Sequence, residues 1–528
     1  MDQRELNQES AERREQAPTR WKVFAFATTL LIGFGSHYSA HVISTLKSTI
    51  KTDLGINNAQ YGVLQAAVAL VNTVFPIIGG RFIDMFGTTT GSMFACTCIA
   101  LGALLLPISA HLRSFGLMFS GRMLYGLGSM TIITVQQTML SLWFRSSSLS
   151  TVVGLQIATS RLASYLATLL TVPIKKATGW YGYAFWVAFA LCFASWIADI
   201  VLVLGMRSFY GKPLAQEEVV SNLAVPAAPK STIYGTVSGD ASGDIENSNS
   251  SSRTAAGSSA AHLSSAQEPP SAAPIKQHPL FSLAIIDALP RAFWIIIALS
   301  LTLGAVWTVF LHISPELIMQ WYGQSESLAA FNASFGQVVP LVAAPAVGRL
   351  MDARGMRPQL LIVACLSLTV GLSLLWAKVQ PPIAALLLFS LSLGIGPVAM
   401  VSSIGLAVDP AMTGTALGIY KTATNVGAAL LDPAVGWLQD ITHGYTAPVA
   451  VLICVTLAAT VLAALLWATA TKPGPASGSA MPDASPLPGS ADSPTSKFAL
   501  GRIMSWLLAV LMLLSWALSV YLLTVKSE

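Results

Sequence analysis

Long apolar runs recur along this chain, and each is close to the length that crosses a lipid bilayer. A membrane-spanning helix needs about 20 mostly apolar residues. Six such runs precede the middle of the chain and six follow it: 21–46, 60–80, 89–110, 115–142, 149–174 and 180–206, then 291–320, 328–350, 358–377, 381–408, 413–438 and 446–470. The pattern predicts an all-α membrane protein built as two six-helix halves.

The composition excludes most classes of soluble protein. Only 10% of the 528 residues are charged, whereas a soluble domain carries about 25%. The net charge of +5 is small for this length, so we expect no nucleic-acid partner. The five cysteines lie within apolar runs, which favours buried thiols over a disulfide or zinc site. Motifs typical of phosphate-binding, serine-hydrolase or metalloprotease sites do not occur, so we expect no enzyme activity, no metal and no cofactor.

Polar segments divide the chain. Residues 207–290 and 471–500 are rich in Ser, Ala, Pro and Gly, and such segments bury too little apolar surface to fold alone. We expect a cytosolic tail at 1–20, an N-terminal half at 21–206, a disordered cytosolic linker at 207–290, a C-terminal half at 291–470 and a second linker at 471–500. The last segment, 501–528, holds one more apolar run from Trp506 to Val525. We expect it to span as a thirteenth helix, and the alternative is a helix that lies on the membrane surface.

The placement of arginine and lysine predicts that the N-terminus faces the cytosol, because cytosolic segments carry more of these residues. In that orientation the short cytosolic segments hold ten of them and the opposite loops hold six: Arg4, Arg13, Arg14, Arg20, Lys22, Arg81, Arg145, Arg349, Arg354 and Arg357 against Lys47, Lys51, Arg113, Lys175, Lys176 and Lys378.

A short motif is repeated at equivalent places in the two halves. Both copies read G-R-x-x-D-x-x-G, with the fixed glycines and aspartates at Gly80, Asp84 and Gly87 and at Gly348, Asp352 and Gly355. We expect both copies in the loop after the second helix of a half. Glycine permits close approach of helices, and a carboxylate attracts the positive end of another helix. The motif is therefore a candidate gating element, and the alternative is a pair of solvated loops.

This motif and the 6 + 6 layout resemble the major facilitator superfamily. A second signature of that family, R-x-x-x-G-x-G, is matched by residues 122–128 in the fourth run. The resemblance covers about 21–206 and 291–470, and it implies a twelve-helix transporter that works by alternating access. The family motif usually has an arginine directly after the aspartate. Here Met85 and Ala353 occupy those positions, which weakens the ion pair that the family implies.

Three further places are similar to the lysosomal dipeptide uniporter subfamily of that superfamily: residues 33–36, then 121–144 with 153–156 and 160–164, and 414–427. The resemblance implies that Arg161 holds the C-terminal carboxylate of a peptide, since a guanidinium binds a carboxylate through two parallel hydrogen bonds. The alternative is an internal ion pair. The subfamily also implies an acidic residue in the fourth helix that holds the peptide amino group. That position falls at Met130, so this contact must come from elsewhere or the substrate differs.

Other polar residues within apolar runs are candidate substrate ligands, because such groups are costly in a membrane unless they are paired or hydrated. Lys421 could bind a carboxylate or reach the membrane interface. His37 and His41 are spaced i, i+4 and share one helix face, where they could respond to pH or simply pack. Asn425 and Gln156 offer neutral hydrogen bonds.

Charged residues elsewhere in the runs allow structural roles as well. Arg122 is either a gating charge or a residue that bonds to backbone and loops. His312 and Glu316 form another i, i+4 pair, which could supply an acid at the outer gate but fits an exposed rim slightly better. For Asp199 and Asp432 we expect structural pairing near the cytosolic helix ends.

The expected function is uniport of a small carboxylate-bearing solute such as a dipeptide. The alternatives are a proton-coupled exporter of another small molecule, such as a sugar or drug, and a membrane sensor that transports nothing. The resemblance implies a lysosomal or vacuolar membrane, and the plasma membrane stays open. We expect a monomer in the bilayer, and the resemblance allows a glycosylated accessory subunit.

Overall fold

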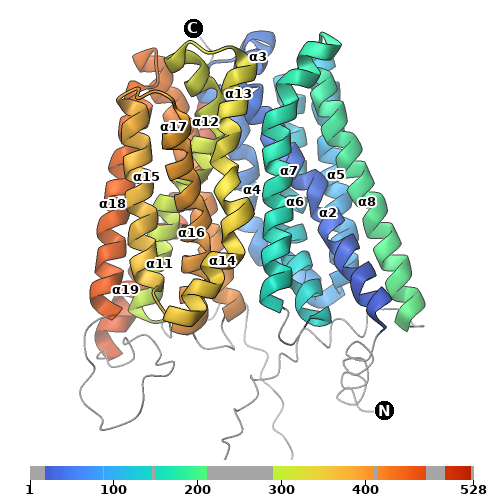
Figure 1. Ribbon diagram of the computed structural model, residues 1–528, viewed down its shortest axis with the longest axis vertical. Coiled ribbons are helices and arrows are strands. Elements are labelled where there is room, and N and C mark those ends of the chain that lie inside the picture. The colour runs from blue at the N-terminus through green and yellow to red at the C-terminus, as the bar shows by residue number, and fades with distance from the viewer. Residues whose placement is uncertain are drawn as a thin grey trace, which may run out of the picture. The chain divides into compact units, whose positions relative to one another are not determined.

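The computed structural model describes residues 18–86, 88–144, 149–210, 289–408, 413–470 and 494–524. These residues form helices joined by short turns, and none of them lies in a strand. Helices from the first half of the chain gather on one side of the bundle and helices from the second half on the other (Figure 1). The prediction of an all-α protein with two helical halves is confirmed.

Six long helices and one short helix make up the described part of the N-terminal half. They are α2 (Thr19–Thr45), α3 (Lys47–Leu54), α4 (Asn58–Phe86), α5 (Thr88–Leu112), α6 (Phe115–Trp143), α7 (Leu149–Thr178) and α8 (Gly182–Tyr210). The short helix α3 directly follows the first apolar run and carries both Lys47 and Lys51. Its place defines one end of the bundle, which we call the α3 end, and the other end is called the opposite end.

The C-terminal half repeats six spanning segments, two of which are interrupted. The elements are α11 (Arg291–Leu299), η1 (Ser300–Gly304), α12 (Ala305–Tyr322), α13 (Glu326–Ser334), η2 (Phe335–Gln337), α14 (Val338–Arg354), α15 (Arg357–Trp376), α16 (Ile383–Ala407), α17 (Thr413–Thr442) and α18 (Thr446–Ala470). The sequence predicted continuous helices where the π-helical turn η1 and the 3-10 turn η2 occur. Most residues of both turns are buried, and η2 contributes to the candidate site below.

Local chemistry accounts for these two interruptions. At η1, the Ser300 hydroxyl donates to the Tyr420 carbonyl of α17 at 3.0 Å, and Gly427 lets α17 touch the Leu301 backbone. At η2, the chain passes through Gly336 and then meets Pro340, which has no N–H to donate back to residue 336. Turns of this kind inside helices frequently mark functional positions.

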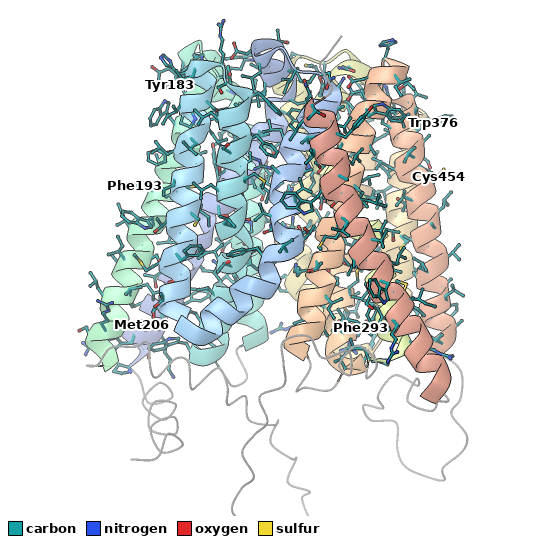
Figure 2. All side chains as sticks on the ribbon, turned by 180° about the vertical axis from the view of Figure 1, so that it is seen from behind. Tyr183, Phe193, Met206, Phe293, Trp376 and Cys454 are labelled. Carbon is teal, nitrogen blue, oxygen red and sulfur yellow. The ribbon has the colours of Figure 1, made fainter. Side chains whose placement is uncertain are left out.

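Ten stretches of the described residues are long and apolar enough to cross a membrane. The other three long helices, α4, α6 and α17, have 29, 29 and 30 residues. At 1.5 Å per residue such helices are about 45 Å long. Large apolar side chains cover the outside of the bundle (Figure 2), among them Phe193 on α8 and Trp376 at the end of α15. This exterior suits contact with hydrocarbon.

The two glycines of the R-x-x-x-G-x-G signature, Gly126 and Gly128, and Gly121 directly before it pack helices together. A Cβ atom on Gly128 would overlap the Ala95 carbonyl of α5, and one on Gly121 would lie 2.9 Å from Leu105 of the same helix. Gly126 instead faces α4 at Val68 and Val71. The signature therefore lets α6 approach α5 and α4 closely, as small residues do in membrane helix pairs.

The two halves touch mainly along two seams, and α12 also contacts α2 and α3. In the first, α4 packs against α17, and in the second, α7 packs against α13 and α14. At the α3 end of the first seam, Cβ atoms on Gly62 and Gly436 would collide with the Asp432 and Asn58 backbone carbonyls, respectively. In the second seam Gly154 of α7 lies against Pro345 of α14. The backbones of α4 and α17 are thus in direct contact at the α3 end.

The repeated motif lies inside helices, so its predicted loop position is wrong. Gly80 and Asp84 belong to the last two turns of α4, and Gly348 belongs to α14. In the first copy no turn-forming residue interrupts positions 81–86, so α4 continues through it. Only the final glycine of the second copy, Gly355, ends a helix: it has a φ of +64° and donates its N–H to the Met351 carbonyl at 2.9 Å. Glycine is favoured in this left-handed capping position.

Other parts of the motif are not tested. Gly87 and the side chains of Asp84 and Asp352 lie outside the described residues. A Cβ atom on Gly348 would meet no atom within 4 Å. The gating role of the motif therefore stays a prediction.

The thirteenth helix is present and packs on the bundle. Helix α19 (Pro494–Thr524) begins inside the stretch that the sequence assigned to a linker, which agrees with the preference of proline for the first position of a helix. It contacts α4, α17 and α11, and it crosses these helices on the face shown in Figure 2. Residues 501–524 are one of the candidate spans, and exposed Trp506 and Leu513 point away from the bundle.

Candidate functional site

Four basic side chains from the two halves form one electrostatically interacting group. We call Arg161 of α7, Lys421 of α17, and His37 and His41 of α2 the central cationic group. Arg161 lies close enough to interact electrostatically with each of the other three. None of the four side chains forms an ion pair with a carboxylate that the structure describes. The structure thus brings together four residues that the sequence proposed separately.

Arg161 reaches across to the C-terminal half. Its guanidinium donates to the Gln337 side-chain carbonyl at 3.2 Å, and Gln337 is 1% exposed and belongs to the interrupting turn η2. A guanidinium has five N–H donors, so this single neutral contact leaves donors for another partner. The Gln337 amide nitrogen is itself buried without a hydrogen-bond partner. The sequence analysis missed Gln337, although the nearby Gly336 and Pro340 were a signal for a break in the helix.

Lys421 is the one member of the central cationic group that belongs to the C-terminal half. Its ammonium lies 5.5 Å from the centre of the Tyr420 ring, a weak cation–π contact. Asn425 donates its side-chain amide to the Lys421 backbone carbonyl at 2.8 Å. Asn425 therefore uses one N–H within its own helix, which leaves its second N–H and its carbonyl oxygen as groups it could offer to a ligand.

The histidines lie on the N-terminal side of the group, on one face of α2. The Nε2 atom of His37 is buried without a hydrogen-bond partner. His41 interacts electrostatically with Arg161, His37, Arg122 and His312. It therefore lies between basic residues of both halves.

Gln156 belongs to a chain of amides that ties α7 to α6 and α2. Its amide donates to the Gln136 side-chain carbonyl at 3.3 Å, and the Gln136 amide donates to the Thr29 backbone carbonyl at 2.6 Å. Gly33 makes room for this chain, since a Cβ there would lie 2.5 Å from the Gln136 side chain. The Gln156 carbonyl oxygen remains buried without a partner, so it could still accept a bond from a ligand.

Arg122 of α6 is buried next to, but not inside, the central cationic group. It donates to the Gln65 carbonyl at 3.0 Å and lies 5.7 Å from the centre of the Tyr125 ring. The Gln65 amide continues this chain to the Tyr61 hydroxyl at 2.8 Å. The Tyr61 hydroxyl in turn donates to the Ile43 backbone carbonyl of α2 at 3.0 Å, so these contacts connect α6, α4 and α2. The gating role of Arg122 stays a prediction.

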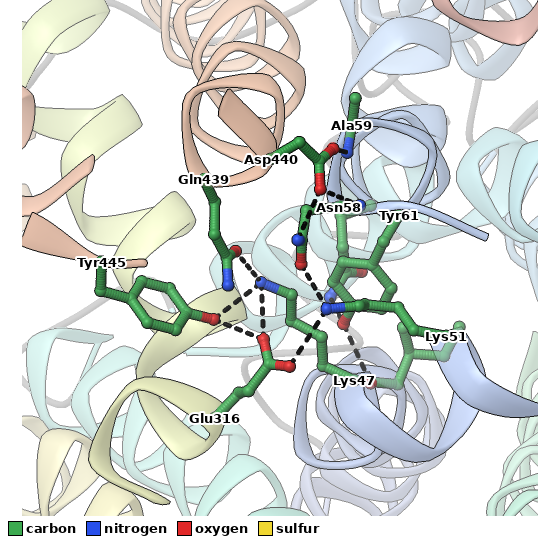
Figure 3. Close-up of polar contacts among 11 residues, drawn as sticks. Lys47, Lys51, Asn58, Ala59, Tyr61, Glu316, Gln439, Asp440 and Tyr445 are labelled. Atoms are coloured by element: carbon green, nitrogen blue, oxygen red, sulfur yellow. Dashed lines mark hydrogen bonds and ion pairs between the residues drawn. The ribbon is translucent and has the colours of Figure 1, made fainter. Parts of the chain in front are cut away.

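A second group of charges closes the α3 end. We call Lys47, Lys51, Glu316, Gln439 and Tyr445 the Lys47 cluster (Figure 3). The Lys47 ammonium lies 2.9 Å from the Glu316 carboxylate and also donates to Gln439 and Tyr445 at 2.8 Å each. Lys51 lies 3.3 Å from the same carboxylate, to which Tyr445 also donates. The two lysines belong to the N-terminal half, and the other three residues belong to the C-terminal half.

Burial sets the electrostatics of this cluster. Lys47 is 1% exposed and Glu316 is 4% exposed, so the expected exposed rim around Glu316 is wrong. Burial lowers the pKa of Lys47, and the adjacent Glu316 carboxylate opposes that shift. Because Glu316 already has three partners, it does not supply the amine-binding acid that was considered for it.

Further contacts join the halves around the Lys47 cluster. The Asp440 carboxylate of α17 accepts the backbone N–H groups of Asn58 and Ala59 at 3.0 and 2.8 Å, so it caps the positive N-terminus of α4. Lys175 of α7 lies 2.8 Å from Glu326 of α13. Apart from the i, i+4 position of Glu316, no sequence pattern pointed to these residues, because each partner lies in the other half.

Two remaining carboxylates lie deeper in the bundle. The His312 ring nitrogen Nδ1 lies 3.0 Å from Asp432. Asp432 lies ten residues before the α3 end of α17, and in the predicted orientation the α3 end is the non-cytosolic one. Its expected place near the cytosolic end of the helix is therefore wrong. The error came from the direction of the eleventh run, which ends on the α3 side. Asp199 of α8 is fully buried beside Ser92 and Cys96 of α5 and has no ion-pair partner among the described residues.

Comparison with known families gives a match across the helical part of the chain. The family model described as the Major Facilitator Superfamily matches residues 29–431, and a second match covers 296–527. Among solved structures, the nucleoside transporter NupG is similar, with a TM-score of 0.57 at 13% sequence identity. The alignment covers 84% of this chain and 99% of NupG. Because the sequence identity is so low, the similarity concerns the fold alone.

Curated relatives match over a shorter stretch. Proteins named lysosomal dipeptide transporter MFSD1 are 28% identical in Mus musculus and 30% identical in Danio rerio, each over 134 residues. A protein named probable anion transporter 3, chloroplastic, from Oryza sativa subsp. japonica is 29% identical over 121 residues. These matches cover 25%, 25% and 23% of this chain and 29%, 29% and 23% of the relatives. The chain thus spans less than a third of each relative's length.

Proposed function

The chain belongs to the major facilitator superfamily of membrane transporters, and we propose that it carries a small carboxylate-bearing solute across a membrane by alternating access. The observation that supports this most strongly is Arg161. Its guanidinium lies between the two halves with one neutral partner, Gln337, and without an ion-pair partner among the described carboxylates. A charge in that situation is costly unless a ligand neutralises it.

The ligand that best fits Arg161 is a carboxylate. The flat guanidinium presents paired N–H groups that match the two carboxylate oxygens. The unpartnered Gln337 amide nitrogen and His37 Nε2 atom are further polar groups near it. They could bond to the rest of a small solute.

Transport requires that this site open to each side in turn. The Lys47 cluster and the contact of α4 with α17 close the α3 end. We propose that these contacts break when the halves rock about the central cationic group. In transporters of this architecture the substrate site lies near the midplane between the repeats.

Dipeptides are the substrate class that the curated relatives favour, and a lysosomal membrane is the location that their names favour. In this proposal the peptide C-terminus lies on Arg161 and the protein works as a uniporter. Met130 stands where the subfamily resemblance implies an acid for the peptide amine. The amine would therefore need a neutral acceptor, such as the Gln156 carbonyl oxygen, which is buried without a partner.

Transport of a non-peptide anion is the second candidate. The excess of basic side chains around Arg161 favours it, and the rice relative is named an anion transporter. Both candidates share the Arg161–carboxylate contact, so one variant tests them together.

The test is uptake by proteoliposomes that hold the purified protein, with dipeptides, amino acids, sugars and mono- and dicarboxylates offered one at a time. We expect Arg161→Ala to lower the uptake of the carboxylated solute about 10- to 100-fold, since hydrogen bonds to charged groups contribute about 1.5–3 kcal/mol. Uptake by Arg161→Lys should lie between that of Arg161→Ala and that of the wild type, because lysine keeps the charge and loses the paired hydrogen bonds.

Arg113→Ala is the matched control, because the Arg113 side chain is 73% exposed at the α3 end. Uptake unchanged by Arg161→Ala would refute the proposed role of Arg161. A folded protein that moves none of the solutes would instead favour a membrane sensor.

A further inference from the structure

A glutamine of the C-terminal half accepts a hydrogen bond from Arg161. One guanidinium nitrogen of Arg161 donates to the side-chain carbonyl of Gln337 at 3.2 Å. Because a guanidinium only donates hydrogen bonds, the Gln337 amide turns its oxygen to Arg161, and its nitrogen is buried without a hydrogen-bond partner. Gln337 thus presents to Arg161 an oxygen of the kind that a solute carboxylate would present.

The backbone around Gln337 is packed against a neighbouring helix. Gln337 is 1% exposed and ends the 3-10 turn η2. Two residues further on, the Val339 N–H donates to the Ser390 hydroxyl of α16 at 2.9 Å, and a Cβ atom on Gly336 would lie 3.5 Å from the Phe389 ring of the same helix. The glutamine therefore lies on a packed turn of the C-terminal half, whereas its hydrogen-bond partner lies on α7 of the N-terminal half.

A carrier that works by uniport must also return without its solute. Between its two open states the site is closed to both sides, and bulk water no longer hydrates Arg161. In the loaded carrier the solute carboxylate balances the guanidinium. In the return step Arg161 depends on groups of the protein, and no carboxylate that the structure describes forms an ion pair with it. A buried charge without a partner is costly, so the return step needs an acceptor such as Gln337.

We propose that Gln337 stands in for the solute: it accepts the Arg161 hydrogen bond while no solute is bound, and it thereby allows the carrier to return. A solute carboxylate takes over this donor when it binds. A half-turn of the Gln337 amide exchanges its oxygen and nitrogen, so the same side chain then donates an N–H to the carboxylate. This inference rests on the proposed function and names the residue that decides between net transport and one-for-one exchange.

The test measures two modes of transport in proteoliposomes. Net uptake into vesicles that hold no solute requires the carrier to return without it, whereas exchange uptake into vesicles preloaded with the unlabelled solute does not. The probes are radiolabelled glycylglycine, propionate and succinate, each at a saturating concentration, and the comparison uses whichever of them the wild type transports best.

The first variant is Gln337→Met, which keeps the length of the side chain and removes its amide. We expect it to lower net uptake about 10-fold or more and exchange less than about 3-fold, because a hydrogen bond to a charged group contributes a factor of about ten or more. The measured quantity is the ratio of exchange to net uptake, which a variant that was merely misfolded would leave unchanged.

The second variant, Gln337→Glu, should act in the opposite sense. Its carboxylate would form an ion pair with Arg161 and would compete with the solute. The solute concentration for half-maximal uptake should therefore rise about 10-fold or more in both modes, and the ratio of exchange to net uptake should not rise. Gln320→Met is the matched control, because it makes the first substitution at an exposed position of α12, and it should leave both modes unchanged.

The outcomes separate the two proposals. Equal loss of net uptake and exchange in Gln337→Met, or no loss of either, would overturn the stand-in role of Gln337 and keep the Arg161 site. Exchange without net uptake in the wild type would overturn that role as well, since the carrier would then not return without solute. Failure of the wild type to move any carboxylated solute in either mode would overturn the proposed function too.

Discussion

The buried ion pair between Lys47 and Glu316 joins the two halves at the α3 end. Lys47 and Glu316 are almost completely buried and come from different halves. Removing one member of a buried ion pair costs about 3–5 kcal/mol, because the other charge is left unpaired, whereas replacing both by apolar groups is often neutral. We therefore expect the loss of either Lys47 or Glu316 to destabilise the folded protein more than the loss of both.

A double-mutant cycle measures this link. We expect Glu316→Leu and Lys47→Met, each made alone, to lower the free energy of unfolding of the detergent-solubilised protein by about 3 kcal/mol or more. The double variant Lys47→Met with Glu316→Leu should recover a large part of that loss. Additive effects of the two single changes would contradict the coupling. The Arg113–Asp53 pair, whose arginine is 73% exposed, is the control, and it should contribute less than about 1 kcal/mol.

Sequence patterns singled out the residues of the central cationic group but not the role of those in the Lys47 cluster, and the physical reason is local context. Arg161 and Lys421 stand out because they are charged side chains within apolar runs, where an unpaired charge is costly. Lys47 follows the end of its run and looked like an ordinary loop lysine. Its partners Gln439 and Tyr445 are 392 and 398 positions away, so only the packing of one half against the other buries it.

At the scale of elements, hydropathy predicted the long helices but not the turns that interrupt two of them. The π-helical turn η1 and the 3-10 turn η2 interrupt continuous apolar runs, and hydropathy has no term for backbone hydrogen bonding. The glycines of residues 121–128 were assigned to a family signature, and the structure gives them a packing role between α6, α5 and α4. Helix α19 lies where the final apolar run predicted a span, and its contacts with both halves were not predictable from that run.

Helix α19 joins the halves through Trp516. This side chain packs near Leu70 of α4 and Ala428 of α17, and its indole N–H lies 3.3 Å from the Thr73 hydroxyl. We expect Trp516→Ala to lower the free energy of unfolding by about 1–2 kcal/mol, of which a membrane hydrogen bond contributes about 0.6 kcal/mol. It should also speed transport if α19 restrains the α4–α17 seam.

Thermal unfolding in detergent and uptake in proteoliposomes measure the two effects. Trp506→Ala is the matched control, because Trp506 lies on the same helix and is 71% exposed. Equal effects of the two substitutions would show that α19 contributes apolar surface and does not restrain the seam.

At the scale of the whole molecule, the two halves meet in a closed arrangement at the α3 end. The Lys47 cluster, the Asp440 cap and the glycine contacts of α4 with α17 all lie there. The family and the pairing of halves were predictable from the repeated layout. The closed conformation at the α3 end was not predictable, because the sequence of a protein that alternates between two states must encode the contacts of both states.

Distances between spin labels test alternating access most directly. Labels on Thr52→Cys and Leu328→Cys mark α3 and α13 at the α3 end, and labels on Leu155→Cys and Arg354→Cys mark α7 and α14 at the opposite end. All four positions are exposed, and the five native cysteines are replaced beforehand. With the transported solute present, we predict that a longer distance appears at the α3 end while the distance at the opposite end shortens. Distances that stay fixed at both ends in a protein that transports the solute would contradict the account.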